Sequence, residues 1–280
     1  MFLTVRMRTL ALLLAVLIII PFTFVAAFSP KEPEGIPLTV IMYHSIIDKS
    51  SYSGRYIIMP KHLEEDIAYL KENGYGFVTV ADLINYVEKD LPLPEKPVML
   101  TFDDGSYNNY LYALPLFEKY DARGVFSVIG VMCEKYAELD DKNPLYANLN
   151  WKHISELNDS GRVEIQNHSY NFHTAGTGRE GSKKRKNETL DEYRNLLSSD
   201  LLKLQDLLEK HCGIIPTAFV YPYGAISKES FDIIKELGFN SSFSCTEGRN
   251  YITKNPDCLY MLKRNIRTPQ ISAEQIVERK

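Results

Sequence analysis

Short apolar runs alternate with longer amphipathic stretches along this chain. Residues 98–102 and 124–129 are almost wholly apolar, and the stretch between them, 108–120, has the length of a helix. Apolar runs of this length suit parallel strands that are buried on both faces. The order strand, helix, strand therefore predicts a parallel α/β architecture.

The same alternation continues on both sides of this unit. It predicts further strands at 38–43, 77–80, 162–166 and 217–220, and further helices around 63–70, 82–89, 190–211 and 227–237. Five leucines of the longest helix form a stripe that we expect in the core, namely Leu196, Leu197, Leu201, Leu204 and Leu208. Residues 134–151 are polar and contain Pro144, so we expect a long loop there.

Two adjacent carboxylates follow the apolar run 98–102. Asp103 and Asp104 can share a site only where the strand ends and the backbone turns, which Gly105 permits. One carboxylate can then bind a metal while the other accepts a proton. An aspartate before a helix is also a common cap or turn residue, so this motif alone leaves both interpretations open.

Two histidines follow the predicted strand 162–166. His168 and His173 are five residues apart in a chain that has six histidines. Neutral imidazole is the commonest protein ligand for zinc-like ions, and one carboxylate with two imidazoles suits a divalent first-row ion that keeps open positions. The spacing differs from that of a helical pair, so a loop must bring the two rings together.

The segment Thr101-Phe-Asp-Asp-Gly105, together with His168 and His173, resembles the polysaccharide deacetylase family, also called the NodB-homology domain. The resemblance covers residues 36–268 and implies a distorted (β/α) barrel with its site at the carboxyl ends of the strands. It implies that Asp104, His168 and His173 are the metal ligands and that Asp103 is the catalytic base. The implied cofactor is a divalent metal ion, with zinc as the preferred metal and cobalt and nickel as alternatives.

The chain departs from the family pattern at several places, one of which is that no Asp-x-x-x-Trp segment follows Gly224. Val220-Tyr-Pro-Tyr-Gly224 lacks the usual arginine, and Leu262-Lys-Arg264 stands where the family has Leu-x-His. With the early pair Tyr43-His44, these departures resemble the subgroup that acts on 1,6-linked poly-N-acetylglucosamine of biofilms. That resemblance implies His44 as the general acid. The alternative is a core histidine at position 44, with Arg264 or a water supplying the proton.

The resemblance also implies how substrate is held. The backbone N–H of Tyr223 would stabilise the oxyanion, Pro222 would fix this backbone, and Gly224 would leave room for substrate. A simple turn is the alternative for this segment. Tyr107 and Tyr170 stand inside the motifs and are expected to form walls of the substrate site.

The expected reaction is hydrolysis of N-acetyl groups from N-acetylglucosamine residues of an extracellular or cell-wall polysaccharide, with release of acetate. Peptidoglycan is the alternative substrate. A non-catalytic glycan-binding wall protein is a further alternative, but it would be expected to have lost a ligand or the base.

The N-terminus predicts export. Arg6 and Arg8 precede an apolar stretch at 10–28, and Val25-Ala-Ala27 fits a signal-peptidase site. An uncleaved anchor is also consistent with this length. We therefore expect a signal peptide or membrane anchor at 1–28, a linker at 29–35 and a catalytic domain at 36–280. The domain would lie outside the cell, at the wall or on the outer face of the membrane.

Net charge and cysteine content say less about function than the motifs do. A net charge of −4 excludes a global basic signature of nucleic-acid binding, although 183–186 is a local basic run that either is a solvated loop or steers an anionic polymer. The four cysteines can form two disulfides in an oxidising space, or they are buried thiols. We expect a monomer of about 250 residues after removal of the leader, a normal size for one (β/α) barrel.

Overall fold

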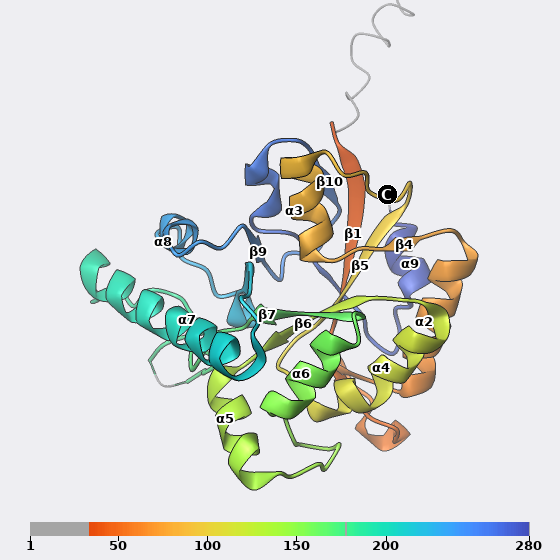
Figure 1. Ribbon diagram of the computed structural model, residues 1–280, viewed down its shortest axis with the longest axis horizontal. Coiled ribbons are helices and arrows are strands. Elements are labelled where there is room, and N and C mark those ends of the chain that lie inside the picture. The colour runs from red at the N-terminus through yellow and green to blue at the C-terminus, as the bar shows by residue number, and fades with distance from the viewer. Residues whose placement is uncertain (1–33, 177, 280) are drawn as a thin grey trace, which may run out of the picture. The chain divides into compact units, whose positions relative to one another are not determined.

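A curved, mostly parallel sheet forms the centre of the molecule (Figure 1). The computed structural model describes residues 34–176 and 178–279. Within the sheet, neighbouring strands follow the order β10-β1-β5-β6-β7-β8-β9, and only the β1–β10 pair is antiparallel among the described strands of this sheet. The strands on this path are β10 (Asn250–Ile252), β1 (Ile36–Tyr43), β5 (Pro97–Phe102), β6 (Gly124–Val128), β7 (Val163–Asn167), β8 (Ala218–Val220) and β9 (Ser241–Phe243).

Short strands complete the sheet and bring its two ends together. Strand β4 (Gly76–Phe77) pairs with the start of β5, and β11 (Asn265–Ile266) pairs in parallel with Ile41 and Met42 of β1. Just before β11, Leu262 forms a parallel bridge with Phe243 of β9. The segment 262–266 therefore lies between β9 and β1. The predicted distorted barrel of parallel strands is confirmed, with this irregular segment on its last side.

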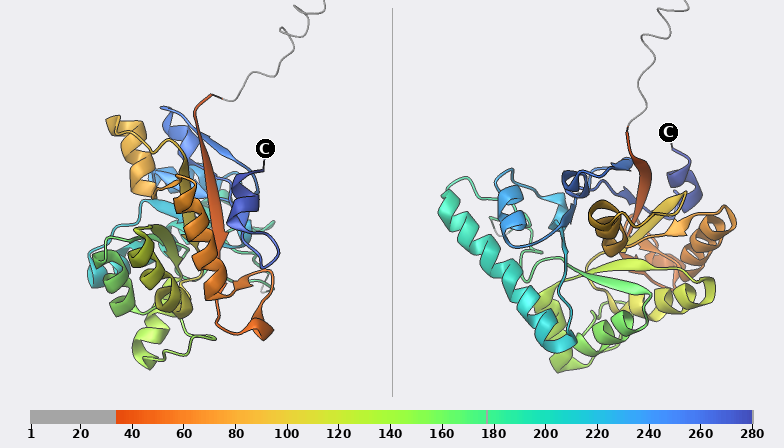
Figure 2. Two further views of the ribbon diagram at one scale, coloured as in Figure 1. Left: turned by 90° about the vertical axis from the view of Figure 1, so that its right-hand side faces the viewer. Right: turned by 45° about the horizontal axis from the view of Figure 1, so that its top comes forward.

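Helices surround the sheet, and α2, α4, α6 and α7 follow one another around its outside (Figure 2). The α-helices are α2 (Pro60–Glu72), α3 (Val80–Lys89), α4 (Tyr107–Tyr120), α5 (Gly130–Leu139), α6 (Trp151–Asp159), α7 (Leu190–Cys212), α8 (Ser230–Glu236) and α9 (Ala273–Val277). Each of the four around the sheet turns an apolar stripe inward. On α7 this stripe is Leu197, Leu201, Leu204 and Leu208, whose side chains are fully buried.

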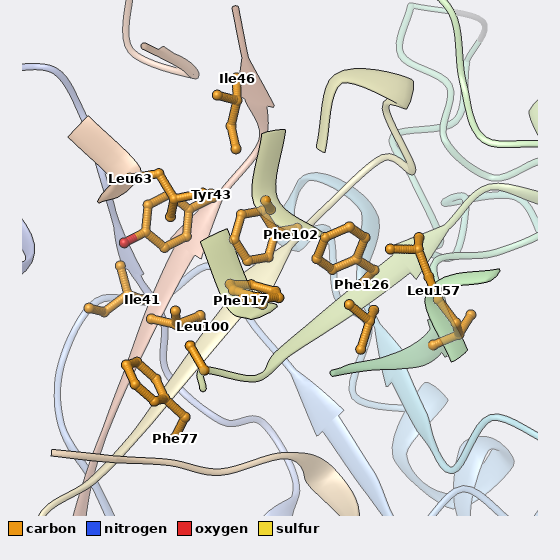
Figure 3. Packing of buried hydrophobic residues seen from close by; sticks show 14 of the residues in the cluster. Ile41, Tyr43, Ile46, Leu63, Phe77, Leu100, Phe102, Phe117, Phe126 and Leu157 are labelled. Atoms are coloured by element: carbon orange, nitrogen blue, oxygen red, sulfur yellow. The ribbon is translucent and has the colours of Figure 1, made fainter. Parts of the chain in front are cut away.

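Aromatic rings pack directly beneath the strand ends (Figure 3). Phe102 stacks on Tyr43 with 4.9 Å between ring centroids and lies 4.7 Å from Phe126. Phe102 immediately precedes Asp103, and Tyr43 immediately precedes His44. Because close-packed interiors resist displacement, this cluster gives the polar residues above it a rigid base.

Three expectations about local structure need correction. Residues 134–139 belong to helix α5 rather than to a loop, because Tyr136 is buried against Tyr107 and Ala147. Leu196 is 48% exposed and stands outside the buried stripe of α7. The predicted strand 77–80 ends at Phe77, since Thr79 caps helix α3 and Val80 begins it.

The structure also bears on the cysteines and on the membrane. All four cysteines are described, and each is a free thiol, with Cys133 buried and the other three partly buried, which favours thiols over disulfides. A membrane-spanning helix is absent from the described residues, since none of their helices combines enough length with enough apolar character. The predicted leader 1–28 lies outside the described residues.

Candidate active site

The polar residues predicted from sequence gather at the carboxyl ends of neighbouring strands. His44 follows β1, Asp103 and Asp104 follow β5, and His168 follows β7. Together with His173 they line one cavity of about 780 Å³. The carboxyl edge of parallel strands is where α/β barrels place their reactive side chains.

Asp104, His168 and His173 form a compact cluster within this cavity. The Nε2 atoms of His168 and His173 lie 3.4 Å and 3.1 Å from Oδ1 of Asp104, and one ligand atom from each residue lies within 4.8 Å of the others. Oδ1 of Asp104 is buried and has no hydrogen-bond partner among the described residues.

Hydrogen bonds on the far side of each ring set the orientation of the imidazoles. Nδ1 of His168 lies 2.8 Å from the carbonyl oxygen of Val220. A carbonyl only accepts, so this nitrogen carries the proton and Nε2 turns a lone pair towards Asp104. Nδ1 of His173 lies 3.1 Å from the hydroxyl of Tyr223. Two imidazole nitrogens and one carboxylate oxygen thus converge, which fits a divalent first-row ion with open positions.

The backbone at the cluster is held in an uncommon conformation. Asp104, Ser169 and Tyr223 have φ values of 69°, 76° and 58°, in the left-handed region that residues other than glycine rarely adopt. The side chain of Asn148 donates to the carbonyl oxygen of Asp104 at 2.7 Å, and that of Asn167 accepts from the N–H of Ser169 at 2.8 Å. Strain of this kind persists where the surroundings fix the backbone, and it is found at functional sites.

Asp103 is buried beside the cluster and paired with a buried cation. Its Oδ1 accepts hydrogen bonds from Nη1 of Arg264 at 2.7 Å and from the hydroxyl of Ser127 at 2.9 Å. Burial raises the pKa of Asp103, but the Arg264 guanidinium and neighbouring imidazoles lower it to about 2. The side chain is therefore an anion at neutral pH. Both contacts are to Oδ1, so Oδ2 is the oxygen that can receive a proton.

His44 lines the same cavity, and both its backbone and its ring make contacts there. Its carbonyl oxygen accepts from Nδ2 of Asn109 at 2.6 Å, and its ring meets the edge of Tyr56 with 4.8 Å between centroids. Nδ1 of the ring is buried without a hydrogen-bond partner among the described residues. Burial lowers the pKa of His44, while Asp103 and Asp104 raise it, and the net shift is downward. This ring differs from a satisfied core histidine.

Of the residues expected to contact substrate, one lines the cavity and others are packed away from it. Tyr223 lines the cavity and is 48% exposed. Tyr107 is buried against Tyr110 and His153, and the hydroxyl of Tyr170 donates to Glu134 at 2.6 Å.

Two cavities border Asp104. Among the described residues that line them are none of the four expected substrate contacts Tyr107, Tyr170, Pro222 and Gly224. Pro222 is buried, and a Cβ on Gly224, at φ 63°, would stand 2.8 Å from Cβ of Cys245. The glycine therefore permits close packing of its loop against Cys245.

Sequence reasoning missed several residues of this cavity. Arg55, Tyr56, Cys245 and Glu247 line it, and Ser127 reaches Asp103 from below. Ser127 is the one hydroxyl in the apolar run 124–129, a signal that the sequence offered. The others stand on loops remote in sequence from the motifs, where no pattern marks them.

The fold and the cluster together define a (β/α) barrel with a candidate metal centre at the carboxyl ends of its strands. A sequence profile of the polysaccharide deacetylase family matches residues 90–242, which is more than half of the chain. The chain belongs to the polysaccharide deacetylase family, a family of hydrolases.

Similarity to individual proteins agrees with this assignment. The chain is 28% identical to the poly-beta-1,6-N-acetyl-D-glucosamine N-deacetylase of Escherichia coli (strain K12), over 74% of this chain and 34% of the relative. It therefore spans about a third of that relative's length. The protein of the same name from Staphylococcus epidermidis (strain ATCC 35984) is 24% identical, over 72% of this chain and 66% of the relative. The solved structure of IcaB from Ammonifex degensii superimposes with a TM-score of 0.69 at 26% identity, covering 87% of this chain and 97% of that one.

Proposed function

We propose that this chain is a metal-dependent N-deacetylase that removes acetyl groups from N-acetylglucosamine residues of a polysaccharide and releases acetate. The observation that carries the proposal is the convergence of His168 and His173 on the unpartnered Oδ1 of Asp104, beside the buried carboxylate of Asp103. Metal-assisted amide hydrolysis uses this combination of a Lewis-acid site and a separate base.

Asp104, His168 and His173 would hold the ion, and zinc is the first choice for two nitrogen ligands and one oxygen ligand, with cobalt or nickel as alternatives. When bound, such an ion supplies a Lewis acid for the acetamide carbonyl and lets water lose a proton near neutral pH.

Asp103 would act as the base that accepts the proton of the attacking water. Arg264 and Ser127 hold its Oδ1 and keep the group ionised, so Oδ2 is available as acceptor. A buried carboxylate that a guanidinium stabilises is a weak base in isolation. Its advantage is position, because proton transfer within a fixed site avoids the entropy of bringing the partners together.

His44 would donate a proton to the departing sugar amine. Support comes from its place in the cavity wall and from the buried, unpartnered Nδ1. Arg264 is a poor alternative acid: burial lowers its pKa, but the neighbouring Asp103 carboxylate raises it by more, so the pKa lies above the ordinary value. The left-handed backbone of Tyr223 at the cavity wall supports a role of its N–H as donor to the developing oxyanion.

The preferred polymer is 1,6-linked poly-N-acetylglucosamine. The relatives from Escherichia coli and Staphylococcus epidermidis are named for this activity, which supports the choice, as does the sequence Tyr43-His44 at the end of the first strand. We further propose that residues 1–28 direct export or anchor the chain in the membrane, that 29–35 form a linker, and that 36–280 form the catalytic domain outside the cell, acting as a monomer without nucleic-acid partners.

Acetate release from defined oligomers tests the proposal. The full chain is stripped with a chelator and supplied with zinc, cobalt or nickel, then offered 1,6-linked and 1,4-linked N-acetylglucosamine oligomers of equal length. We expect release from the 1,6-linked oligomer that depends on added metal. Preference for 1,4-linked oligomers would indicate peptidoglycan as the substrate. Binding of oligomers without acetate release under every condition would indicate a non-catalytic glycan-binding protein. The matched control is Asp103→Asn, which keeps the shape of the site.

A further inference from the structure

The loop between the two candidate histidine ligands is held by side chains rather than by regular secondary structure. The backbone N–H groups of four consecutive residues, Ser169 to Phe172, each donate to a side-chain oxygen. Ser169 donates to Asn167 at 2.8 Å and Phe172 donates to the hydroxyl of Ser169 at 3.0 Å. The conformation of this loop therefore depends on a few specific acceptors.

One carboxylate supplies two of these four acceptors. Oδ1 of Asp200 accepts from the N–H of Tyr170 and Oδ2 accepts from the N–H of Asn171, both at 2.8 Å. Asp200 lies near the middle of α7, where aspartate is a poor helix former. Helix propensity therefore gives no reason for this residue at this position, whereas the paired contact to the loop does.

The opposite side of the loop is fixed by α5. The carbonyl oxygens of Ser169 and Tyr170 accept from the N–H groups of Gly130 and Val131 at 3.1 Å and 2.9 Å. The loop is thus clamped between the first turn of α5 and Asp200 of α7. Removal of Asp200 would release one side of it while the α5 contacts remain.

The two histidines depend on this clamp to different degrees. His168 directly follows β7, is 2% exposed, and is anchored by its own bond to Val220. The His173 side chain is 22% exposed, follows the clamped loop, and has the Tyr223 hydroxyl as its recorded ring partner. The orientation of His173 therefore depends more strongly on the loop.

We propose that Asp200 is a positioning residue for the metal centre, which fixes the loop 169–172 so that His173 presents Nε2 beside Asp104 and His168. This inference rests on the proposed function, because it assumes that these three residues bind one ion. Asp200 touches neither the ion's expected position nor substrate, and it acts through Tyr170 and Asn171. Partners that orient metal ligands in this way contribute to metal affinity although they bind no metal.

Metal titration of the full chain tests the proposal without any assay of turnover. The chain is stripped of metal, then titrated with zinc against a chromophoric chelator and, separately, with cobalt while the visible absorption is recorded. Asp200→Ala should weaken zinc affinity by about 10–100-fold. It should also alter the cobalt spectrum, because one imidazole is no longer held in place. The zinc affinity of Asp200→Asn should lie between those of Asp200→Ala and the unmodified chain, since the amide oxygen can still accept from one N–H.

Asp206→Asn is the matched control, since it removes the same charge from an exposed position of the same helix. It should match the unmodified chain in both titrations. Unchanged zinc affinity and cobalt spectrum in Asp200→Ala would overturn the proposal, even if this variant unfolds at a lower temperature. If Asp200→Ala does not fold, the same comparison with the nearly isosteric Asp200→Asn decides. Failure of the unmodified chain to bind metal would instead refute the proposed function.

Discussion

At the scale of single residues, the least usual feature is the buried pair of Asp103 and Arg264. The guanidinium contacts the carboxylate at 2.7 Å, and the Arg264 side chain is fully buried. Arg264 departs from the Leu-x-His pattern of the resemblance described above, and the structure places it against the candidate base. We therefore expect Arg264 to control the charge and orientation of Asp103.

Replacement of this arginine should change the pH dependence of the reaction. In Arg264→Met, burial would raise the pKa of Asp103 without the guanidinium to oppose it. The acid limb of the kcat/KM profile should therefore move to higher pH. Arg264→Lys, which keeps a cation, should show a smaller shift. An acid limb that stays in place in Arg264→Met would contradict the assigned role of the pair.

The same pair also links stability to pH. Asp103 has a folded-state pKa of about 2, below the ordinary value of 3.8. A depressed carboxyl pKa contributes stability that is present above the ordinary value and is lost as the pH falls through the folded-state value. Arg264→Met should therefore also lower stability near neutral pH, and a folded control by circular dichroism must accompany its kinetics.

His44 can be tested by the choice of leaving group. His44→Ala should retain metal and lose about 10²–10⁴-fold in amide turnover, the usual contribution of a general acid. An activated aryl acetate needs no proton on its leaving group, so its hydrolysis should lose much less. Because the pKa of His44 is lowered from 6.5, the basic limb of kcat/KM should lie below that value and should vanish in the variant. Equal losses of turnover on the amide and on the ester would show that His44 has a structural role only.

At the scale of elements, a second buried ion pair joins parts of the chain that are remote in sequence. Asp66 of α2 accepts from Nε of Arg267 at 2.6 Å, from the hydroxyl of Tyr43 at 3.1 Å and from the N–H of Ala273 at 3.0 Å. These contacts connect α2, β1 and the start of α9. They hold the last side of the barrel, which includes Arg264, against the first strand.

Breaking this network should destabilise the whole barrel. Arg267→Met leaves the buried charge of Asp66 without its partner, which typically costs about 3–5 kcal/mol. The control is Arg194→Met, which removes an ion pair between exposed side chains of Arg194 and Glu236 and should cost at most about 1 kcal/mol. Urea unfolding measures both. Similar losses in the two variants would mean that Asp66 and Arg267 contribute no more than a surface pair.

The elements show what sequence could and could not predict. Strands 98–102 and 124–129 were predicted nearly to the residue because continuous apolar runs mark buried parallel strands. Helix α5 was placed partly in a loop because its stretch is polar, and only its packing against Tyr107 shows that Tyr136 is buried. Arg264 could be seen as a departure from a pattern, but its contact with Asp103, across 161 residues, appears only once the barrel closes.

At the scale of the whole molecule, the described residues from Gly35 onward form one compact unit, and this unit contains four free thiols. Cys133 is buried, and burial raises its pKa to a value far above that of an exposed thiol. The chain denatured without reductant should therefore yield four thiols that react with a disulfide reagent. A count of two or none would show that disulfides form, in conflict with the structure.

The central claim is that Asp104, His168 and His173 hold one divalent ion while Asp103 does not. The most direct measurement is the metal content of purified chains after equilibration with zinc at neutral pH and removal of free ion. We predict about one zinc per chain for the unmodified protein and for Asp103→Asn, and little or none for Asp104→Ala, His168→Ala or His173→Ala, because two remaining ligands compete poorly with water. Full zinc occupancy in any of these three alanine variants, with the fold intact, would contradict the account.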